Sequence, residues 1–580
     1  MKYSDLVEIY EELEKTTKRL EKTYIISEFL KKISGTVLKE TVLLLQGRSF
    51  PQWDERKIGV ASRLVLKAIS QATGISPDKI EKQWAKVGDL GDVAAEFIKE
   101  KKQATLFSTS LTVKKVFDNI QKLATLEGAG TVNKKVGLIA ELLTSAKPNE
   151  AKYIVRTLLE ELRVGTARGT LRDAIVWAYF PKAGVTYNKE EKSIDVVDRE
   201  IYNQQVGLVQ KAYDMSNDFA LVAEKAKKGQ IKTISLKIGI PIKAMLAPKE
   251  ADEKSALERV KSPCQAEYKY DGFRIQVHKD GKEIKLFTRN LENVTKQFPD
   301  VVKYVKSNVK GKGFILDSEA VGFNPMTKAY LPFQNVSQRI KRKYHIEQMA
   351  KDFPVELNVF DCMAYNGEST IQEPFEKRRA LLKKMIIPEN KKIVLSKAKL
   401  VKNEKEIDEF YKKSLNEGQE GLMLKKLNAP YSPGARVGSM VKLKGTKEPL
   451  DLVITKAQWG EGKRAKWFSS FTLACLDKND NFVEIGKVGT GIKEKSEGVT
   501  FTELTKLLKP LIINQKGKTA KVKPKIVVEI AYEEIQKSTN YSSGYALRFP
   551  RVIRLRHMEK SAKDINTLKD VEKYYNEQTK

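Results

Sequence analysis

The spacing of apolar residues changes twice along this chain of 580 residues. Up to about residue 215, apolar residues recur at helical spacing, as at Ile25, Phe29 and Ile33, and Gly35 follows as a stop signal. From about residue 235, strand patterns mix with helical ones, and beyond residue 445 short strands rich in turn residues suit a small β-barrel. The sequence therefore predicts a multidomain protein, with an all-α domain at 1–215, an α+β domain at 235–445 and an all-β domain at 446–580.

The chain is strongly basic. Its 106 lysines and arginines against 74 aspartates and glutamates give a formal charge of +32. This excess favours a polyanionic partner, with nucleic acid first and an anionic membrane surface second. No run of about 18 apolar residues exists, and Met1 to Asp5 lack the apolar core of a signal peptide. We therefore expect a soluble protein of the cytoplasm without a membrane-spanning segment.

Cysteines and histidines are too few and too scattered to form a metal cluster. Cys264, Cys362 and Cys475 lie roughly a hundred residues apart, so neither a zinc module nor a disulfide framework is indicated. The three histidines are equally dispersed. Any bound metal is therefore expected to have oxygen ligands.

The segment Lys269–Arg274 places an amine, a short turn and a guanidinium where one nucleotide phosphate could contact all three. Lys269 ends a strand pattern, and a hairpin signal at Asp280-Gly281 brings the following strand back toward Arg289. Neighbouring cations and partial burial favour the neutral amine, which can attack phosphorus. The alternative is a chance turn, and the segment alone does not decide between the two.

Acidic residues interrupt two apolar strand patterns. Phe314–Val321 carries two acids on one strand face, and Glu420 stands beside a glycine at the start of another strand. Buried carboxylates need a cation or hydrogen-bond donors, which a sugar hydroxyl, Mg²⁺ or a nearby lysine would supply. Glu319 and Glu420 could flank one hard cation.

Two further strands carry candidate ligand groups. Phe360 lies in an apolar strand and is either a core residue or a face on which a base stacks, with the core as the better interpretation from this residue alone. Lys442 and Lys444 share one face of a later strand. In a chain this rich in lysine, that face could equally be a solvated edge.

In order and spacing, these segments resemble the covalent nucleotidyltransferases, and most closely the ATP-dependent DNA ligases of the archaeal and eukaryotic replicative type. The resemblance covers essentially the whole chain. It rests on Pro241–Ala247, Lys269–Arg274, Phe287–Asn290, Phe314–Val321, Glu420–Lys425 and Ala546–Arg551, together with Leu158–Gly165 in the helical region. It implies a helical DNA-binding domain, a central adenylation domain and an OB-fold domain.

The resemblance also implies a role for each site residue. Lys269 would be the adenylated nucleophile, Glu267 would contact the adenine amino group, and Phe360 would stack on the base. Ribose or phosphate groups would be bound by Arg274, Arg289, Arg436, Lys442 and Lys444. Glu319 and Glu420 would support ribose binding and the metal, Mg²⁺.

The implied reaction joins a nick in double-stranded DNA in three stages. Lys269 takes AMP from ATP, AMP passes to the 5′-phosphate at the nick, and the 3′-hydroxyl displaces AMP. The resemblance implies roles in replication, repair and recombination, and we expect a monomer. Residues 445–449 would be the hinge that lets the last domain move.

Two segments need separate interpretation. The family usually ends with Arg-x-Asp-Lys, whereas this chain has Arg556-His557-Met558-Glu559-Lys560, so either Glu559 substitutes with an offset or ATP loading uses other contacts. Gln103, Leu106 and Phe107 resemble a shortened motif for docking a sliding clamp (PCNA). A loop folded into its own domain is an equal alternative.

Two other functions compete with DNA ligation. An RNA ligase or RNA guanylyltransferase would share the lysine segment but leaves the long helical region without a role. A noncatalytic basic scaffold would leave the spacing of Lys269, Glu319, Glu420 and Lys442 unexplained. The nucleotide that labels the protein covalently would distinguish the three.

Overall fold

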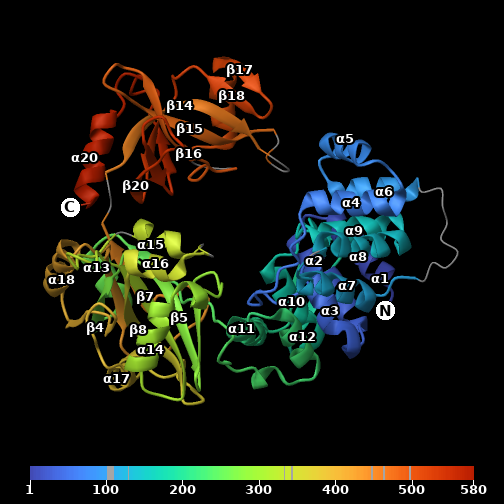
Figure 1. The fold of residues 1–580 in the computed structure, drawn as a ribbon, viewed down its shortest axis with the longest axis horizontal. Helices are drawn as coiled ribbons and strands as arrows, with labels where there is room; N and C mark the ends of the chain where they lie inside the picture. Colours follow the sequence, from blue (N-terminus) through green and yellow to red (C-terminus); the bar gives the residue numbers. More distant parts are fainter. Residues whose placement is uncertain are drawn as a thin grey trace. The chain divides into compact units, whose positions relative to one another are not determined.

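The computed structural model describes residues 1–100, 110–128, 130–331, 333–340, 342, 344–445, 448–460, 464, 466–494 and 498–579. These residues form two compact units. One unit comprises Met1–Lys249, Glu253–Phe410 and Leu422–Lys442, and the other comprises Glu250–Asp252, Tyr411–Gly421 and Leu443–Lys580. Figure 1 colours the chain from its helical start through two central sheets to a strand-rich end.

The first part of the chain is helical. Its helices are α1 (Tyr3–Lys15), α2 (Arg19–Lys32), α3 (Leu38–Leu45), α4 (Ser62–Thr73), α5 (Pro77–Val87), α6 (Leu90–Lys99), α7 (Val113–Thr125), α8 (Thr131–Ser145), α9 (Pro148–Leu158), α10 (Arg168–Tyr179), α11 (Arg199–Ser216) and α12 (Phe219–Lys227). A short hairpin of β1 (Val185–Asn188) and β2 (Ser193–Val196) lies between α10 and α11.

Local sequence explains where several of these helices begin and end. Asp198 and Asp218 cap α11 and α12 by accepting hydrogen bonds from backbone N–H groups of the first turn. The apolar spacing predicts a helix over Tyr153–Arg163 that ends near Gly165, but α9 ends at Leu158. Its continuation is broken because Glu160 and Arg163 adopt positive φ angles of 56° and 59°.

The central part contains two sheets. Their strands are β3 (Lys249–Glu250), β4 (Cys264–Lys269), β5 (Phe273–Asp280), β6 (Glu283–Thr288), β7 (Gly313–Gly322), β8 (Val355–Tyr365), β9 (Glu368–Ser369), β10 (Ile393–Leu395), β11 (Ala398–Val401), β12 (Gly421–Lys426) and β13 (Met440–Lys444). One sheet has the order β10-β8-β7-β5-β6, with β9 beside β8, and the other has the order β11-β4-β12-β13-β3. The predicted turn at Asp280-Gly281 joins β5 to β6 as an antiparallel hairpin.

Helices pack against the first sheet. The helices of this part are α13 (Glu253–Val260), α14 (Pro299–Asn308), α15 (Phe333–Ile340), α16 (Ile346–Asp352), α17 (Phe375–Met385) and α18 (Glu404–Asn416). α14 packs against β6 and β10, and α17 packs against β8. Their apolar residues, including Val301, Val305 and Leu382, join the buried core of the sheet.

The segment that leads into the central part is fastened to β5 by buried side chains. The Gln276 amide accepts a hydrogen bond from the N–H of Ile242 at 2.7 Å and donates one to its carbonyl at 3.2 Å. The backbone N–H of Gly239 donates to Nδ1 of His278 at 2.9 Å, and Nε2 of His278 lies 2.9 Å from the Gln276 amide oxygen. Burial lowers the pKa of His278 to about 3, so this imidazole is neutral.

The last part is a strand-rich barrel flanked by helices. Its strands are β14 (Leu450–Trp459), β15 (Phe468–Leu476), β16 (Phe482–Val488), β17 (Ile512–Lys516), β18 (Thr519–Val522), β19 (Val527–Ala531), β20 (Glu534–Lys537), β21 (Tyr545–Arg548) and β22 (Arg551–Leu555). The main sheet runs β16-β15-β14-β18-β17, with β19 joining β14 to β22. Helices α19 (Phe501–Leu508) and α20 (Leu568–Thr579) pack on its core.

The predicted succession of an all-α, an α+β and an all-β part is confirmed. α12 lies beyond residue 215 and shares the core of the earlier helices through Phe219 and Val222. The three cysteines are buried and unpaired. None of the helices in the described part of the chain is long and apolar enough to cross a membrane.

Candidate active site

Lys269 is the last residue of β4 and is half-buried. The turn that follows it lies against β7, where a Cβ added at Gly272 would come within 2.5 Å of the carbonyl oxygen of Ala320. The same Cβ would lie 3.0 Å from Cγ of Glu319. Glycine is therefore required at this close approach, which brings the Lys269 turn and Glu319 together.

A buried ion pair lies along the same strand. The carboxylate of Glu267 is 2% exposed, and its Oε2 accepts a hydrogen bond from Nζ of Lys425 on β12 at 2.7 Å. The other oxygen, Oε1, accepts from Nε2 of Gln265 at 2.7 Å and lies 3.6 Å from Nη1 of Arg379. Glu267 and Lys269 share one face of β4 because side chains alternate along a strand.

Phe360 is tied to this ion pair through the same lysine. Nζ of Lys425 lies 4.8 Å from the centre of the Phe360 ring, which is half-buried on β8. A cation over an aromatic face is attracted by the ring's negative quadrupole. The structure therefore brings the predicted adenine contact, Glu267, and the predicted stacking ring, Phe360, around one cation that the sequence interpretation did not single out.

Arg274 is engaged in a second buried pair. Its Nε lies 2.5 Å from Oδ1 of Asp317, and its Nη2 donates to Oδ2 at 3.0 Å. Burial raises the pKa of the Asp317 carboxyl, while the guanidinium beside it acts in the opposite direction. Arg274 also stands opposite Glu319 in the β5–β7 register.

The two acids predicted on one face of β7 thus differ in their surroundings. Asp317 is 2% exposed and pairs with Arg274, whereas Glu319 is half-buried beside the Lys269 turn. The salt-bridge alternative therefore applies to Asp317, although the cation is an arginine and not a lysine. Glu319 keeps the position from which a substrate group could be reached.

The remaining predicted ligands lie on other elements. Arg289 follows β6 and is exposed, and Arg436 is exposed in the loop before β13, where it bridges to Leu246. Lys442 is half-buried on β13.

Lys444 and Glu420 form an ion pair of their own. Nζ of Lys444 lies 3.2 Å from Oε2 of Glu420 and 3.4 Å from Oε2 of Glu533. Burial lowers the pKa of Lys444, but the two carboxylates outweigh it, so the pKa lies above its usual value. Within the described residues no group of three or more His, Cys, Asp and Glu side chains is arranged to hold a metal ion.

The unusual C-terminal segment folds back on itself. The N–H groups of Glu559 and Lys560 both donate to the carbonyl of Arg556. Met558 lies in the turn between Arg556 and Glu559 and is 87% exposed. Nε of Arg556 then lies 2.9 Å from Oε2 of Glu559, and Nζ of Lys560 donates to Asp451 at 2.7 Å. The extra residue is thus accommodated in the turn, and Glu559 reaches the arginine despite the offset.

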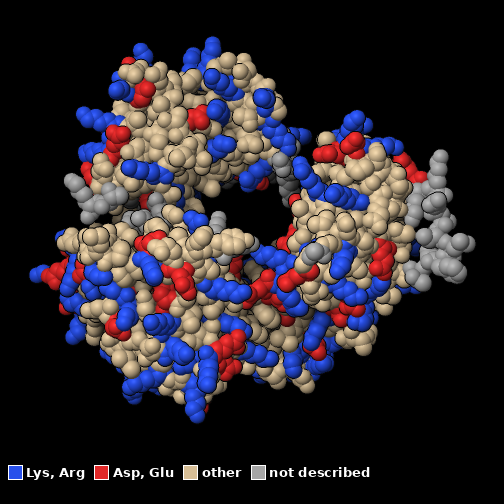
Figure 2. Space-filling model, in the orientation of Figure 1, with Lys and Arg blue, Asp and Glu red and all other residues tan. Residues whose placement is uncertain are grey.

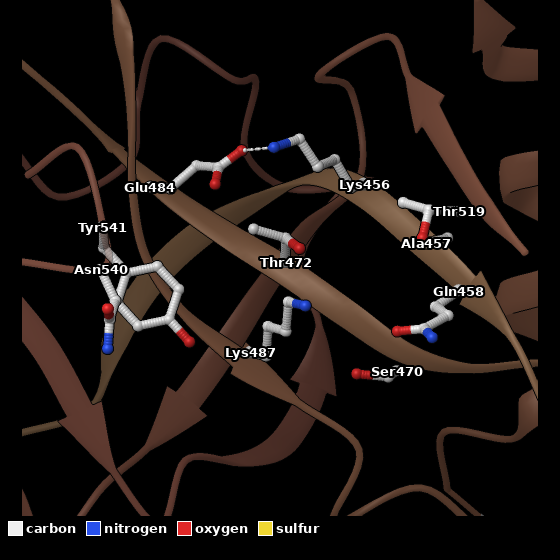
Figure 3. A pocket seen from close by; sticks show the side chains of 10 residues that line it. All are labelled: Lys456, Ala457, Gln458, Ser470, Thr472, Glu484, Lys487, Thr519, Asn540 and Tyr541. Atoms are coloured by element: carbon white, nitrogen blue, oxygen red, sulfur yellow. Dashed lines mark ion pairs between the residues drawn. The ribbon is translucent and has the colours of Figure 1, made fainter. Parts of the chain in front are cut away.

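The barrel carries a polar pocket of about 380 Å³. Figure 3 shows Lys456 paired with Glu484, and Nζ of the lysine lies 2.6 Å from Oε1 of the glutamate. Strand register places Lys456, Thr472 and Lys487 in one row across β14, β15 and β16. In Figure 2, Lys and Arg side chains are spread over the visible face with acidic residues between them.

Comparison with known proteins decides the family. Family models described as DNA ligase N terminus, ATP dependent DNA ligase domain, and ATP dependent DNA ligase C terminal region match residues 2–176, 244–444 and 464–559. A DNA ligase of Nanoarchaeum equitans is 46% identical over 584 residues, covering 99% of this chain and 98% of its own length.

The chain belongs to the ATP-dependent DNA ligase family. A second DNA ligase, from Thermococcus onnurineus, is 41% identical over 579 residues and covers 99% of this ligase and 98% of its own length. The solved structure Pmar-Lig_PreS3 has a TM-score of 0.56 at 16% identity and covers 95% of this chain and 99% of its own. That structure supports the ligase fold alone.

The sequence interpretation missed two buried residues at this candidate site. Lys425 contacts Glu267 and Phe360, and Tyr431 donates to Asp317, the partner of Arg274. Alternation along β12 places Lys425 on the face opposite the core residue Leu424. This pattern could have indicated that Lys425 faces the candidate site. Pairing partners far apart in sequence had no such signal.

Proposed function

We propose that this ligase seals nicks in duplex DNA through a lysyl-AMP intermediate on Lys269. The observation that carries the proposal is the position of Lys269, half-buried at the end of β4 on the same face as the buried Glu267. A lysine held at the boundary between protein and solvent can meet a nucleotide on one side and stay accessible to DNA on the other.

The first step is attack by the Lys269 amine on the α-phosphorus of ATP, which forms a phosphoramidate and releases pyrophosphate. We assign adenine recognition to Glu267 and Phe360, whose shared contact with Lys425 fixes both. Oε1 of Glu267 already accepts from Gln265, and the amino group of adenine would be a second donor to the same oxygen. A carboxylate oxygen has two lone pairs, so both donors fit.

Charge builds on phosphate oxygens during each displacement, so cations are the expected catalysts. We assign ribose and phosphate contacts to Arg274, Arg289, Arg436, Lys442 and Lys444. Lys444 would have to leave Glu420 and Glu533 to reach a phosphate, because both carboxylates now neutralise it. The exposed Arg289 and Arg436 have no such barrier to moving.

Mg²⁺ usually keeps several waters and is bound by one or two carboxylates together with substrate phosphates. Glu319 fits this donor set because it is half-buried beside the Lys269 turn, and Glu420 fits when Lys444 turns to phosphate. When bound, the ion supplies charge neutralisation on phosphate oxygens. Glu319 would also accept a hydrogen bond from a ribose hydroxyl.

Duplex binding is assigned to the helical domain and to the polar face of the barrel. OB-folds bind nucleic acid on a strand face and its flanking loops. Lys487, Thr472, Ser470 and Gln458 around the pocket offer a cation and uncharged polar groups to a sugar-phosphate backbone (Figure 3). Such contacts fix the position of a duplex without reading its sequence.

The deciding experiment offers labelled ATP, GTP and NAD to the purified protein, followed by denaturing electrophoresis, and then a nicked duplex. Covalent label from ATP together with closure of the nick is expected. Label from GTP alone would favour RNA guanylyl transfer, and no label from any donor would favour a noncatalytic scaffold. Peptide mapping places the label on Lys269 or refutes that assignment.

Several finer proposals need their own tests. Domain boundaries near residues 215, 235 and 445 are proposed cleavage points for limited proteolysis, and Gly445 begins the proposed hinge, whose residues 446–447 lie outside the described residues. A monomeric state would be checked by sedimentation. A cytoplasmic location, where the protein is associated with DNA in replication, repair and recombination, would be checked by fractionation.

The sliding-clamp segment with Gln103, Leu106 and Phe107 lies outside the described residues. We propose it as a docking motif on its sequence alone. Phe107→Ala should weaken binding to a sliding clamp and leave intrinsic sealing intact. Unchanged affinity for the clamp would refute the motif.

A further inference from the structure

A buried chain of hydrogen bonds continues from Arg274 beyond Asp317 to a tyrosine. The hydroxyl of Tyr431 donates to Oδ2 of Asp317 at 2.9 Å, the same oxygen that accepts from Nη2 of Arg274. Asp317 is 2% exposed, Tyr431 is 3% exposed, and the side chain of Arg274 is 9% exposed. The three groups therefore form one interior unit that solvent does not screen.

The direction of the Tyr431 hydroxyl proton follows from its other partner. The backbone N–H of Met245 donates to the hydroxyl oxygen at 3.2 Å, and a backbone N–H can only donate. The hydroxyl must therefore send its own proton to Asp317. The backbone fixes the tyrosine as well, because the N–H of Tyr431 donates to the carbonyl of Ile371 at 2.8 Å.

This arrangement fixes the plane of the Asp317 carboxylate. A carboxylate that meets only one arginine can rotate about its Cβ–Cγ bond, but a second donor on Oδ2 opposes that rotation. With the plane fixed, both oxygens face the guanidinium and hold it at two points. The guanidinium of Arg274 is thereby held in one orientation at the end of this hydrogen-bond chain.

The loop that carries Tyr431 also carries a second predicted phosphate ligand, Arg436. Beyond the tyrosine, the N–H of Gly434 donates to the carbonyl of Ala244 at 3.2 Å, and the N–H of Leu246 donates to the carbonyl of Ala435 at 2.9 Å. One end of this loop is thus fixed in the interior by the hydroxyl of Tyr431. The other end is fixed by these two backbone hydrogen bonds next to Arg436.

We propose that Tyr431 is a positioning residue for the nucleotide step: it holds Asp317 and, through Asp317, orients Arg274 toward the ribose or phosphate oxygens of ATP. The inference rests on the proposed function. Tyr431 itself touches no reacting atom. Its effect is transmitted by the two hydrogen bonds that meet at Oδ2 of Asp317.

Tyr431→Phe tests the inference because it removes the hydroxyl and keeps the ring. The KM for ATP in covalent labelling should rise about ten-fold, since the variant loses a buried hydrogen bond to a charged group. Tyr153→Phe is the matched control, because the buried Tyr153 also donates to a carboxylate, Glu14, at 2.7 Å, but in the helical domain. The control should leave the KM for ATP unchanged while losing a comparable hydrogen bond.

A double-mutant cycle with Asp317→Asn separates positioning from general packing. If Tyr431 acts through Asp317, the double variant should have the same KM for ATP as Asp317→Asn alone. Independent, multiplicative effects, or an unchanged KM in Tyr431→Phe, would overturn the inference. Should Tyr431→Phe not fold, the isosteric Asp317→Asn takes its place, and an unchanged KM for ATP in that variant would equally overturn it.

Failure of the inference can be told from failure of the proposed function. The wild-type protein is labelled with ATP first, and absence of label there would refute the lysyl-AMP proposal before any variant is made. Normal wild-type labelling with an unchanged KM in Tyr431→Phe would refute only the positioning role.

Discussion

The central domain and the barrel use charged side chains in opposite ways. In the central domain, paired charges are buried within a sheet, as in Glu267–Lys425 and Arg274–Asp317, or between a helix and a sheet, as in Arg378–Asp361, all with side chains under one-tenth exposed. In the barrel, pairs such as Lys456–Glu484 and Arg554–Glu529 lie at the surface, with their basic side chains 40% and 53% exposed.

The difference agrees with the two kinds of recognition that we propose for this ligase. A buried pair keeps one geometry because leaving its partner would strand a charge in the interior, which suits a site that must hold a small nucleotide for chemistry. A surface pair is screened and easily exchanged, so a barrel lysine can pass from a carboxylate to a DNA phosphate at little cost. The predictions below test this contrast.

The largest effect is expected at the nucleophile. Lys269→Ala should reduce covalent labelling by ATP by more than ~10³-fold, because no other group replaces the attacking amine. It should still seal a nick that is already adenylated. Lys282→Ala, at an exposed lysine in the β5–β6 turn, is the control and should label normally. Normal labelling of Lys269→Ala would refute Lys269 as the nucleophile and, with it, the proposed nucleotide chemistry of the central domain.

The second prediction concerns the cost of breaking a pair. Lys425→Met should lower the free energy of unfolding by about 3–5 kcal/mol, because Glu267 is left as an uncompensated buried charge. Lys456→Met in the barrel should cost less than about 1 kcal/mol. Urea denaturation of both variants gives the comparison. Similar losses in the two would show that burial is not what separates the domains.

A double variant sharpens this result. Adding Glu267→Gln to Lys425→Met removes the stranded charge and should restore part of the lost stability. If the second change only deepens the loss, packing and not charge accounts for the first.

The third prediction concerns duplex binding by the barrel. Lys487→Ala should weaken binding to a nicked duplex and reduce the slope of log affinity against log salt by about 1. Glu484→Gln should instead strengthen binding to the nicked duplex, since it releases Lys456 from its carboxylate. Lys478→Ala, at an exposed turn residue, is the control. Equal effects of Lys487→Ala and the control would remove the pocket face from the proposed duplex surface.

The smallest effect is expected at the unusual C-terminal turn. Glu559→Gln should change the free energy of unfolding by less than about 1 kcal/mol, because the Arg556–Glu559 pair is at the surface. Arg556 also lies near Glu529 at 3.6 Å and Asp451 at 3.9 Å, so other carboxylates remain. A melting curve of the variant measures this. A loss of unfolding free energy comparable to that of Lys425→Met would show that this surface pair contributes as much as the buried pairs.

The sequence predicted strands better than partners. Alternation located β7 and the face that Asp317 and Glu319 share, because side-chain period is a local property. It could not show that Asp317 meets Arg274 while Glu319 borders the Lys269 turn, since register between strands decides this. Glu267 and Lys425 are 158 residues apart, and no local pattern joins them. The extra residue near Met558 was visible, but the turn that absorbs it was not.

His278, which joins the segment around Gly239 to β5, makes the stability of this ligase sensitive to acid. His278 has a pKa of about 3 in the folded chain and about 6.5 in an unfolded one, so the unfolded chain binds its proton first as the pH falls. Its contribution is complete above pH 6.5 and declines by about 1.4 kcal/mol per pH unit down toward pH 3. Acidification below pH 6.5 should therefore lower the free energy of unfolding, while the imidazole of the folded chain stays neutral down toward pH 3.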